Sequence, residues 1–386
     1  MKKIAVIHHS NQFGLGGTEK DMLLFLKYMD KSVFDVHAIA RKHPVPLHRV
    51  YLDRIRGAMG SRKARYRLEQ YRVSSIRAPD FVRELGEERV HYYTPGSLAP
   101  LLKKLSPQIL HVHHSGVSEP PISSPDAVGH IPLIFTINGF GFQDTTEHDK
   151  RVNKILFPSY FIQEKVALWG KNDPRCGVLY CPIEKPHSNG NLRAELSIKE
   201  NIFVIGRVGR NADDIHDPIS LKAYKKIENE NTLFLALAPP PNMVRDAKEL
   251  GIKNIRFLEP TVDEVWLSKF YNTIDVLAHA RTDGETFGCV IAEAMIHARP
   301  VVTHLSHLRN AQAELVQDGI SGFVAPQHDF KAYAGHLRTL MSDRQKCKTM
   351  GQAALKRALE NFEAGLITKK LEKMYLEELK KRGIAS

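Results

Sequence analysis

The chain has 386 residues, and its apolar fraction of 42% and charged fraction of 25% are those of an ordinary globular protein long enough for two domains. No apolar run approaches the roughly 20 residues that cross a bilayer, and the apolar stretch at the N-terminus has no small-residue cleavage site, so we expect a buried strand there rather than a signal peptide. The cysteines have neither CxxC spacing nor a disulfide pattern, which predicts a reducing, cytoplasmic location (Cys176, Cys181, Cys289 and Cys347).

The formal net charge is +12, and much of it lies between Arg41 and Arg72, where ten lysines and arginines accompany only Asp53 and Glu69. Such a run is often a solvated helix face or a loop. It is also typical of peripheral contact with an anionic membrane, here the inner membrane face, or with an anionic acceptor. No nucleic-acid motif accompanies the charge, and aromatic residues are sparse within it, so no nucleic-acid partner is expected.

In the first half of the chain, short apolar runs alternate with helical patterns. We expect strands at residues 3–8, 36–40, 109–113, 133–136, 154–157 and 177–180. Helices are expected at residues 18–28, 98–105 and near 162–169. Alternation of this kind predicts a parallel sheet with helices on both faces.

A polar, turn-rich linker at residues 183–199 separates a first domain, residues 1–182, from a second domain at 200–365. In the second domain we expect strands at 202–205, 232–237, 255–258, 276–279, 301–303 and 322–324. Helices are expected at 219–227, 244–250, 265–271, 330–342, 344–360 and 365–382. The fold class is therefore α/β, with two open Rossmann-like domains and a central crevice that faces the carboxyl ends of the strands.

The loop from Gly14 to Glu19 follows the first strand and opens a helix. Its adjacent glycines, Gly16 and Gly17, let the backbone approach a phosphate or a sugar closely. The loop lacks the Lys-Ser/Thr of a Walker motif and the GxGxxG pattern of nicotinamide cofactor binding, so neither of those ligands is favoured.

The segment from Asp283 to Met295 carries the strongest functional signal. Glu285 and Glu293 are eight positions apart, and a Thr-Phe-Gly turn between them runs into an apolar helix that starts near Phe287. The N–H groups at a helix start have no partner within the helix, and the helix dipole adds positive charge there, so an anion is attracted. Carboxylates beside this point would accept hydrogen bonds from sugar and ribose hydroxyls. The segment therefore predicts a pocket for a nucleotide sugar.

Two arginines, Arg207 and Arg210, follow the first strand of the second domain. At the carboxyl end of that strand they would lie in the crevice and could hold a diphosphate through forked hydrogen bonds. The alternative is a pair of surface salt bridges.

Three histidines, His111, His113 and His114, crowd one strand end in the first domain. His111 and His113 share a face of the strand, since side chains alternate with a period of two. No third ligand accompanies them in the sequence, so we expect an acceptor-binding edge or ordinary crevice lining rather than a metal site. Cys289, inside the anion-site turn, is expected to be a small packing residue rather than a thiolate.

These motifs resemble the retaining glycosyltransferase family 4, which has the GT-B fold. The resemblance rests on four features whose order and separation fit across nearly the whole chain, and the Glu-x7-Glu segment is the most specific of them. The features are Gly16-Gly17-Thr18-Glu19, Gly206-Arg207, the pair Glu285 and Glu293, and Arg299-Pro300-Val301-Val302.

The resemblance implies a role for each of these positions. Glu285 would hold hydroxyls of the donor sugar, Glu293 the ribose diol, and Arg207 a phosphate. The C-terminal helix, about residues 366–386, would cross back onto the first domain. Backbone groups of the turn would face sugar and phosphate (Thr286, Phe287, Gly288 and Cys289). Gly16 and Gly17 of the first loop would border the diphosphate and the acceptor. The further candidates on the acceptor side are Thr18, His113 and His114.

The chain departs from the family pattern at two places. The lysine that usually follows Gly-Arg is missing, and residues 212–216 include Asp213 and Asp214, which would repel a phosphate if they faced it, so Arg210 is the expected substitute. The family often has a histidine where this chain has Asn138, and an asparagine cannot act as an acid or a base near neutral pH.

The predicted reaction moves a sugar from a UDP- or GDP-sugar to an acceptor hydroxyl of a glycan, glycolipid or small molecule, with retention of configuration. Glu285, Asn138 and Arg207 are the expected catalytic positions, and no metal or other cofactor is required because cationic side chains and helix dipoles stabilise the departing diphosphate. Two alternatives stay open, namely a non-catalytic protein that binds nucleotide sugars and an epimerase that acts on the donor alone.

Overall fold

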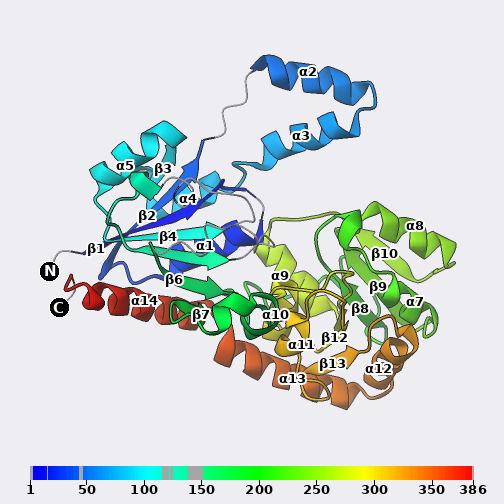
Figure 1. The fold of residues 1–386 in the computed structure, drawn as a ribbon. Helices are drawn as coiled ribbons and strands as arrows, with labels where there is room; N and C mark the ends of the chain where they lie inside the picture. Colours follow the sequence, from blue (N-terminus) through cyan, green and yellow to red (C-terminus); the bar gives the residue numbers. More distant parts are fainter. Residues whose placement is uncertain are drawn as a thin grey trace. The chain divides into compact units, whose positions relative to one another are not determined.

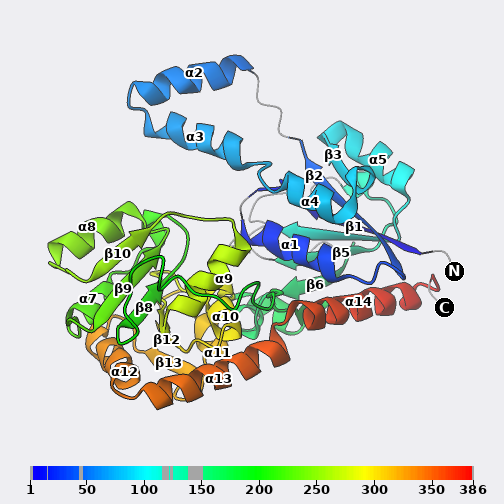
Figure 2. The same ribbon diagram turned by 180° about the vertical axis from the view of Figure 1, so that it is seen from behind.

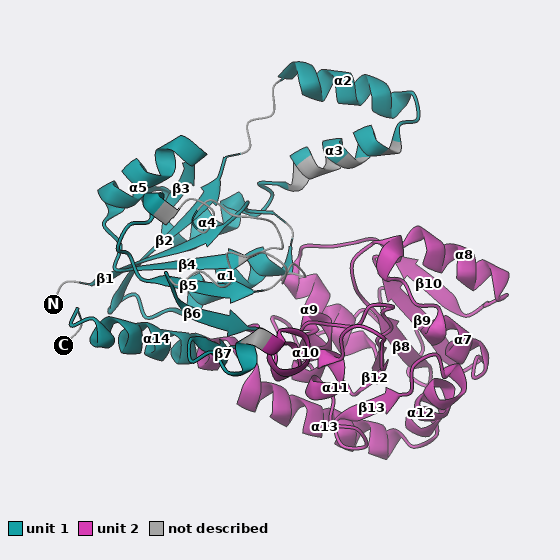
Figure 3. Cartoon of the chain, in the orientation of Figure 1, with its two compact units in different colours: residues 1–158, 169–179, 368–386 teal, residues 159–168, 180–367 magenta. Residues whose placement is uncertain are grey.

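The computed structural model describes residues 3–14, 16–42, 47–114, 121, 125–137 and 151–384. By its internal contacts the chain divides into two units, coloured separately in Figure 3. The first unit comprises residues 1–158, 169–179 and 368–386, and the second comprises 159–168 and 180–367. Residues 183–199, expected to be a linker, are thus counted with the second unit, and the last residues of the chain with the first. The interdomain crevice stays a prediction.

The first unit is built on a seven-stranded parallel sheet with the order β3-β2-β1-β4-β5-β6-β7 (Figure 1). The direction in which strands are added reverses between β1 and β4, which is the Rossmann-like arrangement. Its strands are β1 (Ile4–Ser10), β2 (Phe34–Arg41), β3 (Val90–Tyr93), β4 (Ile109–His114), β5 (Leu133–Ile137), β6 (Val152–Phe157) and β7 (Cys176–Val178). Its helices are α1 (Gly17–Tyr28), α2 (Leu47–Ala58), α3 (Arg62–Val73), α4 (Ala78–Leu85), α5 (Leu98–Leu105) and, from Thr368 onward, α14 (Ala364–Lys381).

The second unit has a six-stranded parallel sheet with the order β10-β9-β8-β11-β12-β13, and here the reversal falls between β8 and β11. Its strands are β8 (Phe203–Arg207), β9 (Thr232–Leu237), β10 (Ile255–Leu258), β11 (Val276–Ala278), β12 (Val301–His304) and β13 (Gly322–Ala325). Its helices are α7 (Ile219–Lys225), α8 (Pro241–Glu249), α9 (Glu264–Thr273), α10 (Cys289–Ile296), α11 (Ala311–Leu315), α12 (Phe330–Ser342) and α13 (Arg344–Asn361).

Alternate residues of the second sheet enter different cores. Val204 of β8 belongs to one buried cluster, while its neighbours Phe203 and Ile205 belong to another. Because side chains of a strand point alternately to the two faces, both faces of this sheet are covered and apolar. Helix starts follow local chemistry: the side chains of Asp263 and Asp343 accept backbone N–H bonds at the beginnings of α9 and α13.

The alternation predicted from the sequence is confirmed as two α/β sheets. The strand β3 and the helices α2, α3, α4 and α11 were not predicted. The segment expected to be a helix near 162–169 is a π-helical turn at Ile162–Val166 followed by a 3-10 turn at Leu168–Lys171. In the described part of the chain, no helix is long and apolar enough to cross a membrane.

Candidate functional site

In the second unit, the reversal of strand order brings the ends of β8 and β11 together. The two strands pair in parallel, with Ile205 opposite Val276 and Gly206 opposite Leu277. Arg207 ends β8, and His279 follows the end of β11 directly. In open parallel sheets, ligands bind outside the carboxyl ends of the strands at the point where the order reverses. Arg207 and His279 therefore mark a candidate ligand site at this edge.

Arg207 is a buried cation that has no acidic partner in the part of the chain that the structure describes. Its side chain is only 6% exposed, and its guanidinium donates to the backbone carbonyls of Leu237, at 3.4 Å, and Ala238, at 3.0 Å. Among the described residues no carboxylate forms an ion pair with it, and burial lowers its pKa to about 10. The guanidinium is still charged at neutral pH, so this edge of the sheet carries an uncompensated positive charge.

Glu285 lies in the loop between β11 and α10 and is held on both carboxylate oxygens. One oxygen lies 3.0 Å from Nε2 of His279, and the other lies 3.6 Å from a guanidinium nitrogen of Arg281. Burial opposes ionisation of Glu285, but the hydrogen bond from His279 and the charge of Arg281 outweigh it, so its pKa is lowered. The side chain of Gln312 accepts the backbone N–H of Glu285 at 3.1 Å, which ties this loop to α11. Glu285 is thus an oriented carboxylate that stays ionised.

The helix that the sequence predicted after the Thr-Phe-Gly turn is α10, and Gly288 is its N-cap with a positive φ of 108°. The side chain of Phe287 is 1% exposed and belongs to the core, so only its backbone is available to a ligand. Cys289 packs against the same core, as expected of a small packing residue. Glu293 lies further along α10, and its carboxylate accepts a hydrogen bond of 2.7 Å from the hydroxyl of Tyr271 in α9, which orients it.

The charged residues that follow Arg207 in the chain lie partly at the surface and partly against helix α8. Arg210 is exposed. The carboxylate of Asp213 accepts the backbone N–H of Asn242 at 2.7 Å, at the start of α8. The imidazole of His216 lies 2.8 Å from the carboxylate of Asp246 in the same helix. Asp213 is therefore engaged with α8.

Gly284 is required by sterics as well as by its backbone angle, since its φ is +68° and an added Cβ would lie 1.7 Å from the carbonyl oxygen of Arg309. Gly319 offers a matched control, with a φ of +74° and no atom within 4 Å of an added Cβ. We expect Gly319→Ala to lower the free energy of unfolding by about 1–2 kcal/mol, the cost of a left-handed residue. Gly284→Ala should lower it by at least about 3 kcal/mol, because overpacking adds to that cost.

Urea unfolding of the two variants measures this difference. Since both residues have the same backbone cost, the excess loss in Gly284→Ala reports the clash beside Glu285. Equal losses would mean that the loop moves aside without strain.

In the first unit, the glycine loop lies after β1, and Gly16 is the N-cap of α1. Gly16 and Gly17 are exposed, and neither has a positive φ, so the loop does not depend on the conformational freedom of these glycines. Thr18 is half-buried in the first turn of α1, whereas His113 is completely buried in β4. Asn138 and the side chain of His114 lie outside the described residues.

His113 belongs to a buried hydrogen-bond chain that crosses the first unit. His113 Nε2 lies 2.9 Å from Nδ1 of His8, and the hydroxyl of Tyr375 in α14 lies 3.2 Å from Nε2 of His8. The same hydroxyl lies 2.5 Å from Nδ1 of His111, whose Nε2 lies 2.6 Å from the hydroxyl of Thr136. Figures 1 and 2 both show α14 running along this sheet. The chain of bonds therefore fastens α14 to β1, β4 and β5.

The third imidazole, His8, was missed from the sequence because it lies on another strand, more than 100 residues from the other two. Nitrogen atoms of His8, His111 and His113 lie within 4.8 Å of one another. The rings of His111 and His113 stack with centroids 4.2 Å apart and planes 22° apart. Neutral side chains can form all of the hydrogen bonds described above, so these residues make a polar network in the core.

Other partners of the candidate residues also escaped the sequence reasoning. These are His279 and Arg281 beside Glu285, and Tyr271 beside Glu293. His279 ends an expected strand and therefore lies at the sheet edge where ligands bind. This position was the one feature of the sequence that could have indicated its role beside Glu285. Tyr271 looked like an ordinary apolar position of a helix.

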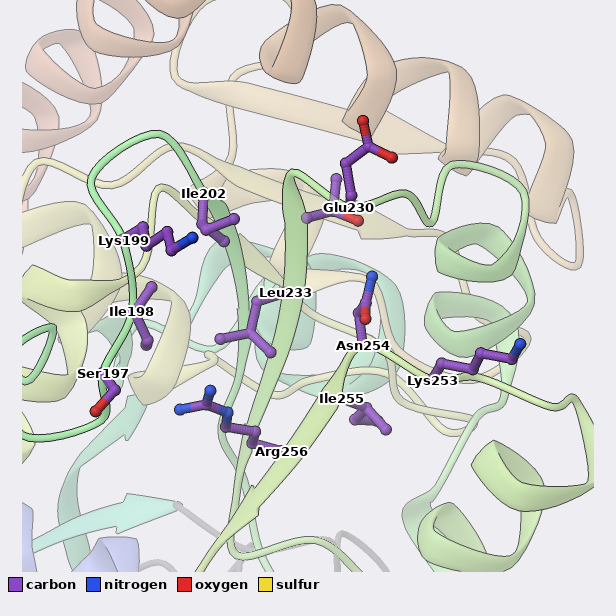
Figure 4. A pocket seen from close by; sticks show the side chains of 11 residues that line it. Ser197, Ile198, Lys199, Ile202, Glu230, Leu233, Lys253, Asn254, Ile255 and Arg256 are labelled. Atoms are coloured by element: carbon purple, nitrogen blue, oxygen red, sulfur yellow. The ribbon is translucent and has the colours of Figure 1, made fainter.

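A pocket of about 360 Å³ lies elsewhere in the second unit (Figure 4). Thr232 and Ile255, the first residues of β9 and β10, line it, as does Ile202 just before β8. The pocket is therefore at the amino-terminal edge of the sheet, and none of the residues expected to hold the donor lines it.

Comparison with known proteins identifies this second unit. Residues 199–343 match the family model described as "Glycosyl transferases group 1". We refer to residues 199–343, which resemble that family, as the group 1 domain. The group 1 domain includes both glutamates and both arginines of the candidate site. A curated relative, the capsular polysaccharide biosynthesis glycosyltransferase CapM of Staphylococcus aureus, is 31% identical over 185 residues, which are 46% of this chain and 47% of that protein. The match thus spans about half the length of the relative.

Two solved structures resemble the chain beyond the group 1 domain. A glycosyltransferase from Rickettsia africae has a TM-score of 0.74 at 16% identity, covering 98% of this chain and 100% of that one. HepE from Anabaena, solved in complex with UDP-glucose, has a TM-score of 0.69 at 19% identity, covering 96% of this chain and 99% of that one. The fold is therefore GT-B, with the group 1 domain as its second Rossmann-like unit.

Proposed function

We propose that the protein is a retaining glycosyltransferase that moves a sugar from a nucleoside diphosphate sugar to an acceptor hydroxyl. The observation that carries the proposal is Arg207, a buried cation at the reversal point of a Rossmann-like sheet that has no acidic partner among the described residues. A buried charge is costly unless an opposite charge compensates it, and a diphosphate would supply two negative charges. The match of residues 199–343 to the glycosyl transferases group 1 model supports this ligand.

In the proposed site, Glu285 accepts hydrogen bonds from hydroxyls of the donor sugar and Glu293 accepts them from the ribose. Their orientation supports these roles, since His279 and Arg281 hold one carboxylate and Tyr271 holds the other. The backbone from Thr286 to Cys289 faces the sugar and phosphates, and Arg210 assists Arg207.

The proposed reaction needs no covalent intermediate on the protein. The bond between the anomeric carbon and the diphosphate oxygen breaks, and its electron pair leaves with the diphosphate. The acceptor oxygen bonds to the anomeric carbon on the same face, and its proton passes to an oxygen of the departing diphosphate. Arg207 and the start of α10 stabilise the negative charge that develops, which is an electrostatic form of catalysis.

We propose UDP or GDP as the nucleotide of the donor. The solved complex of HepE with UDP-glucose, a protein of the same fold, supports a uridine nucleotide. The acceptor is a hydroxyl of a glycan, glycolipid or small molecule, approached from the first unit, where Gly16, Gly17 and Thr18 are the accessible candidates. His113 is less suitable than expected, because it is completely buried. The four cysteines form no disulfide among the described residues, which supports a cytoplasmic location, and we propose peripheral contact to the inner membrane face through the basic segment Arg41–Arg72.

Titration calorimetry with nucleotides and nucleotide sugars tests the proposed site. Glu293→Ala should weaken binding of both UDP and UDP-sugars by roughly 10- to 100-fold, because it removes an ionised acceptor of hydrogen bonds. Glu285→Gln should weaken binding of the UDP-sugar but leave UDP alone unchanged, because Glu285 is assigned to the sugar. Glu249→Ala is the matched control, since that side chain is 68% exposed on α8. If Glu293→Ala binds UDP and GDP as well as the natural protein does, the donor assignment is wrong.

Turnover of the bound donor then separates the three candidate activities. A transferase consumes the nucleotide sugar only with an acceptor, apart from slow hydrolysis. An epimerase converts it with no acceptor present. A non-catalytic binding protein shows the calorimetric signal without turnover against any acceptor in a panel.

A further inference from the structure

The helix α2 presents an apolar stripe to solvent. Leu47, Tyr51 and Ile55 are 88%, 66% and 42% exposed, and Met59, just beyond the helix end, is 82% exposed. These residues are four positions apart, so they lie one above another on a single face of the helix. The backbone N–H of Met59 still bonds to the carbonyl of Ile55 at 3.0 Å, which continues the helical turn. Large exposed apolar groups aligned in this way mark an interaction surface.

The stripe faces away from the helix that supports α2. The opposite side of α2 holds Asp53, which is 1% exposed, and Gly57, which lies against α3. An added Cβ on Gly57 would lie 3.2 Å from the side chain of Arg65, so the two helices cross closely there. Figures 1 and 2 show α2 and α3 as a hairpin that stands clear of the sheet of its own unit. The apolar face therefore has no partner among the described residues.

The exposed charges around the stripe are positive. The only acidic residue of α2, Asp53, is turned inward, where Arg67 forms a two-pronged ion pair with it and lowers its pKa. At 100° per residue, Arg54 lies on one side of the stripe and Arg49 and Arg56 lie on the other. Residues 47–73 hold eight lysines and arginines against two acidic residues, a net charge of +6.

We propose that the outer face of α2 is a membrane-docking surface that inserts its apolar stripe among the headgroups of an anionic bilayer. An amphipathic helix with an apolar face and flanking arginines lies in the plane of such an interface, and the two signals reinforce each other. A second copy of this chain would bring the same positive charge against itself. Nucleic acid would satisfy the arginines but would leave Leu47, Ile55 and Met59 exposed.

The inference rests on the peripheral membrane contact proposed above and assigns it to α2, and it does not depend on the donor site. Flotation of the full chain with vesicles tests it, with phosphatidylglycerol mixed into phosphatidylcholine for one set and pure phosphatidylcholine for the other. Binding to the mixed vesicles is expected to be at least tenfold tighter. Replacing Arg49, Arg54 and Arg56 with Gln should weaken it on the order of a hundredfold, because each cation near an anionic surface contributes about a factor of five.

The apolar stripe has its own variant and control. Tyr51→Ser, Ile55→Ser and Met59→Ser together should weaken vesicle binding more than about tenfold without shifting the melting temperature, because these side chains are exposed. The matched control is the double variant Val262→Ser with Val265→Ser, whose side chains are 62% and 47% exposed in the second unit. This control variant should bind vesicles as the natural protein does. The emission added by Tyr51→Trp should move to shorter wavelength only with anionic vesicles.

Three results would overturn the proposal: equal binding to both kinds of vesicle, no loss in the stripe variant, or displacement of the protein from vesicles by duplex DNA. Calorimetry with UDP on the same variants keeps the two proposals apart. Vesicle binding can fail while UDP binds normally, and a protein that binds no nucleotide can still dock.

Discussion

Lowering the pH from 7 to 5 should destabilise the first unit by at least about 2 kcal/mol. An exposed imidazole has a pKa near 6.5, whereas burial lowers the pKa of His8 to about 3 and holds those of His111 and His113 well below the usual value. Between these values the unfolded chain binds more protons than the folded chain, so folding loses stability as the pH falls below 6.5. His8 contributes about 2 kcal/mol of this loss at pH 5 and its contribution grows toward pH 3, and His111 and His113 add to the loss in the same direction.

Hydrogen exchange of the β1 and β4 amides, followed from pH 7 to pH 5, measures this loss in the first unit alone. His113→Leu removes one titrating group and should reduce the pH dependence, whatever it does to the stability at pH 7. His48→Leu is the control, since His48 is exposed on α2, and it should leave the dependence unchanged. An unchanged dependence in His113→Leu would show that other groups of this unit are responsible.

Arg207→Met should strongly weaken donor binding while leaving the unliganded protein as stable as before or more stable. A buried charge without a partner opposes folding, and replacing such a charge with an apolar side chain of similar size is often neutral or stabilising. The same charge is expected to pair with the diphosphate, so its loss should weaken binding of UDP or GDP at least roughly thirtyfold. This pattern separates a binding residue from a structural one, whose removal lowers stability.

Thermal unfolding with and without UDP reads both effects at once, because a bound ligand raises the melting temperature. Arg207→Met should keep the melting temperature of the unliganded protein and lose the shift. Arg210→Met provides the comparison, since Arg210 is exposed and should lose only part of the shift. A large fall in melting temperature for Arg207→Met without ligand would assign Arg207 to the core instead of the donor.

Much of the architecture could be predicted because it follows from local patterns. The strands at Thr232–Leu237 and Ile255–Leu258 and the helices at Leu98–Leu105 and Phe330–Ser342 have the bounds that their apolar spacing indicated. The strand Val90–Tyr93 escaped because it is short, lies at the sheet edge and is only partly buried, so little hydrophobic patterning marks it.

The helices α2 and α3 escaped for a different reason. Their charge dominated the pattern, and the apolar residues of α2 lie on the face that helix patterning assigns to the core, although here it points to solvent. A sequence pattern shows that a helix has two faces, but it does not show which face meets the protein.

The sequence by itself determined the two-unit α/β architecture, and it predicted the position of Glu285 and Glu293 around the start of a helix. Both follow from spacing over about ten residues, where strand and helix periods act. Only the tertiary structure decided that Arg207 is buried without an acid, that Asp213 is engaged with α8, and that His8 and Tyr375 join His111 and His113. Partners and burial depend on residues far apart in the chain, and the free energy of a charge depends on those surroundings.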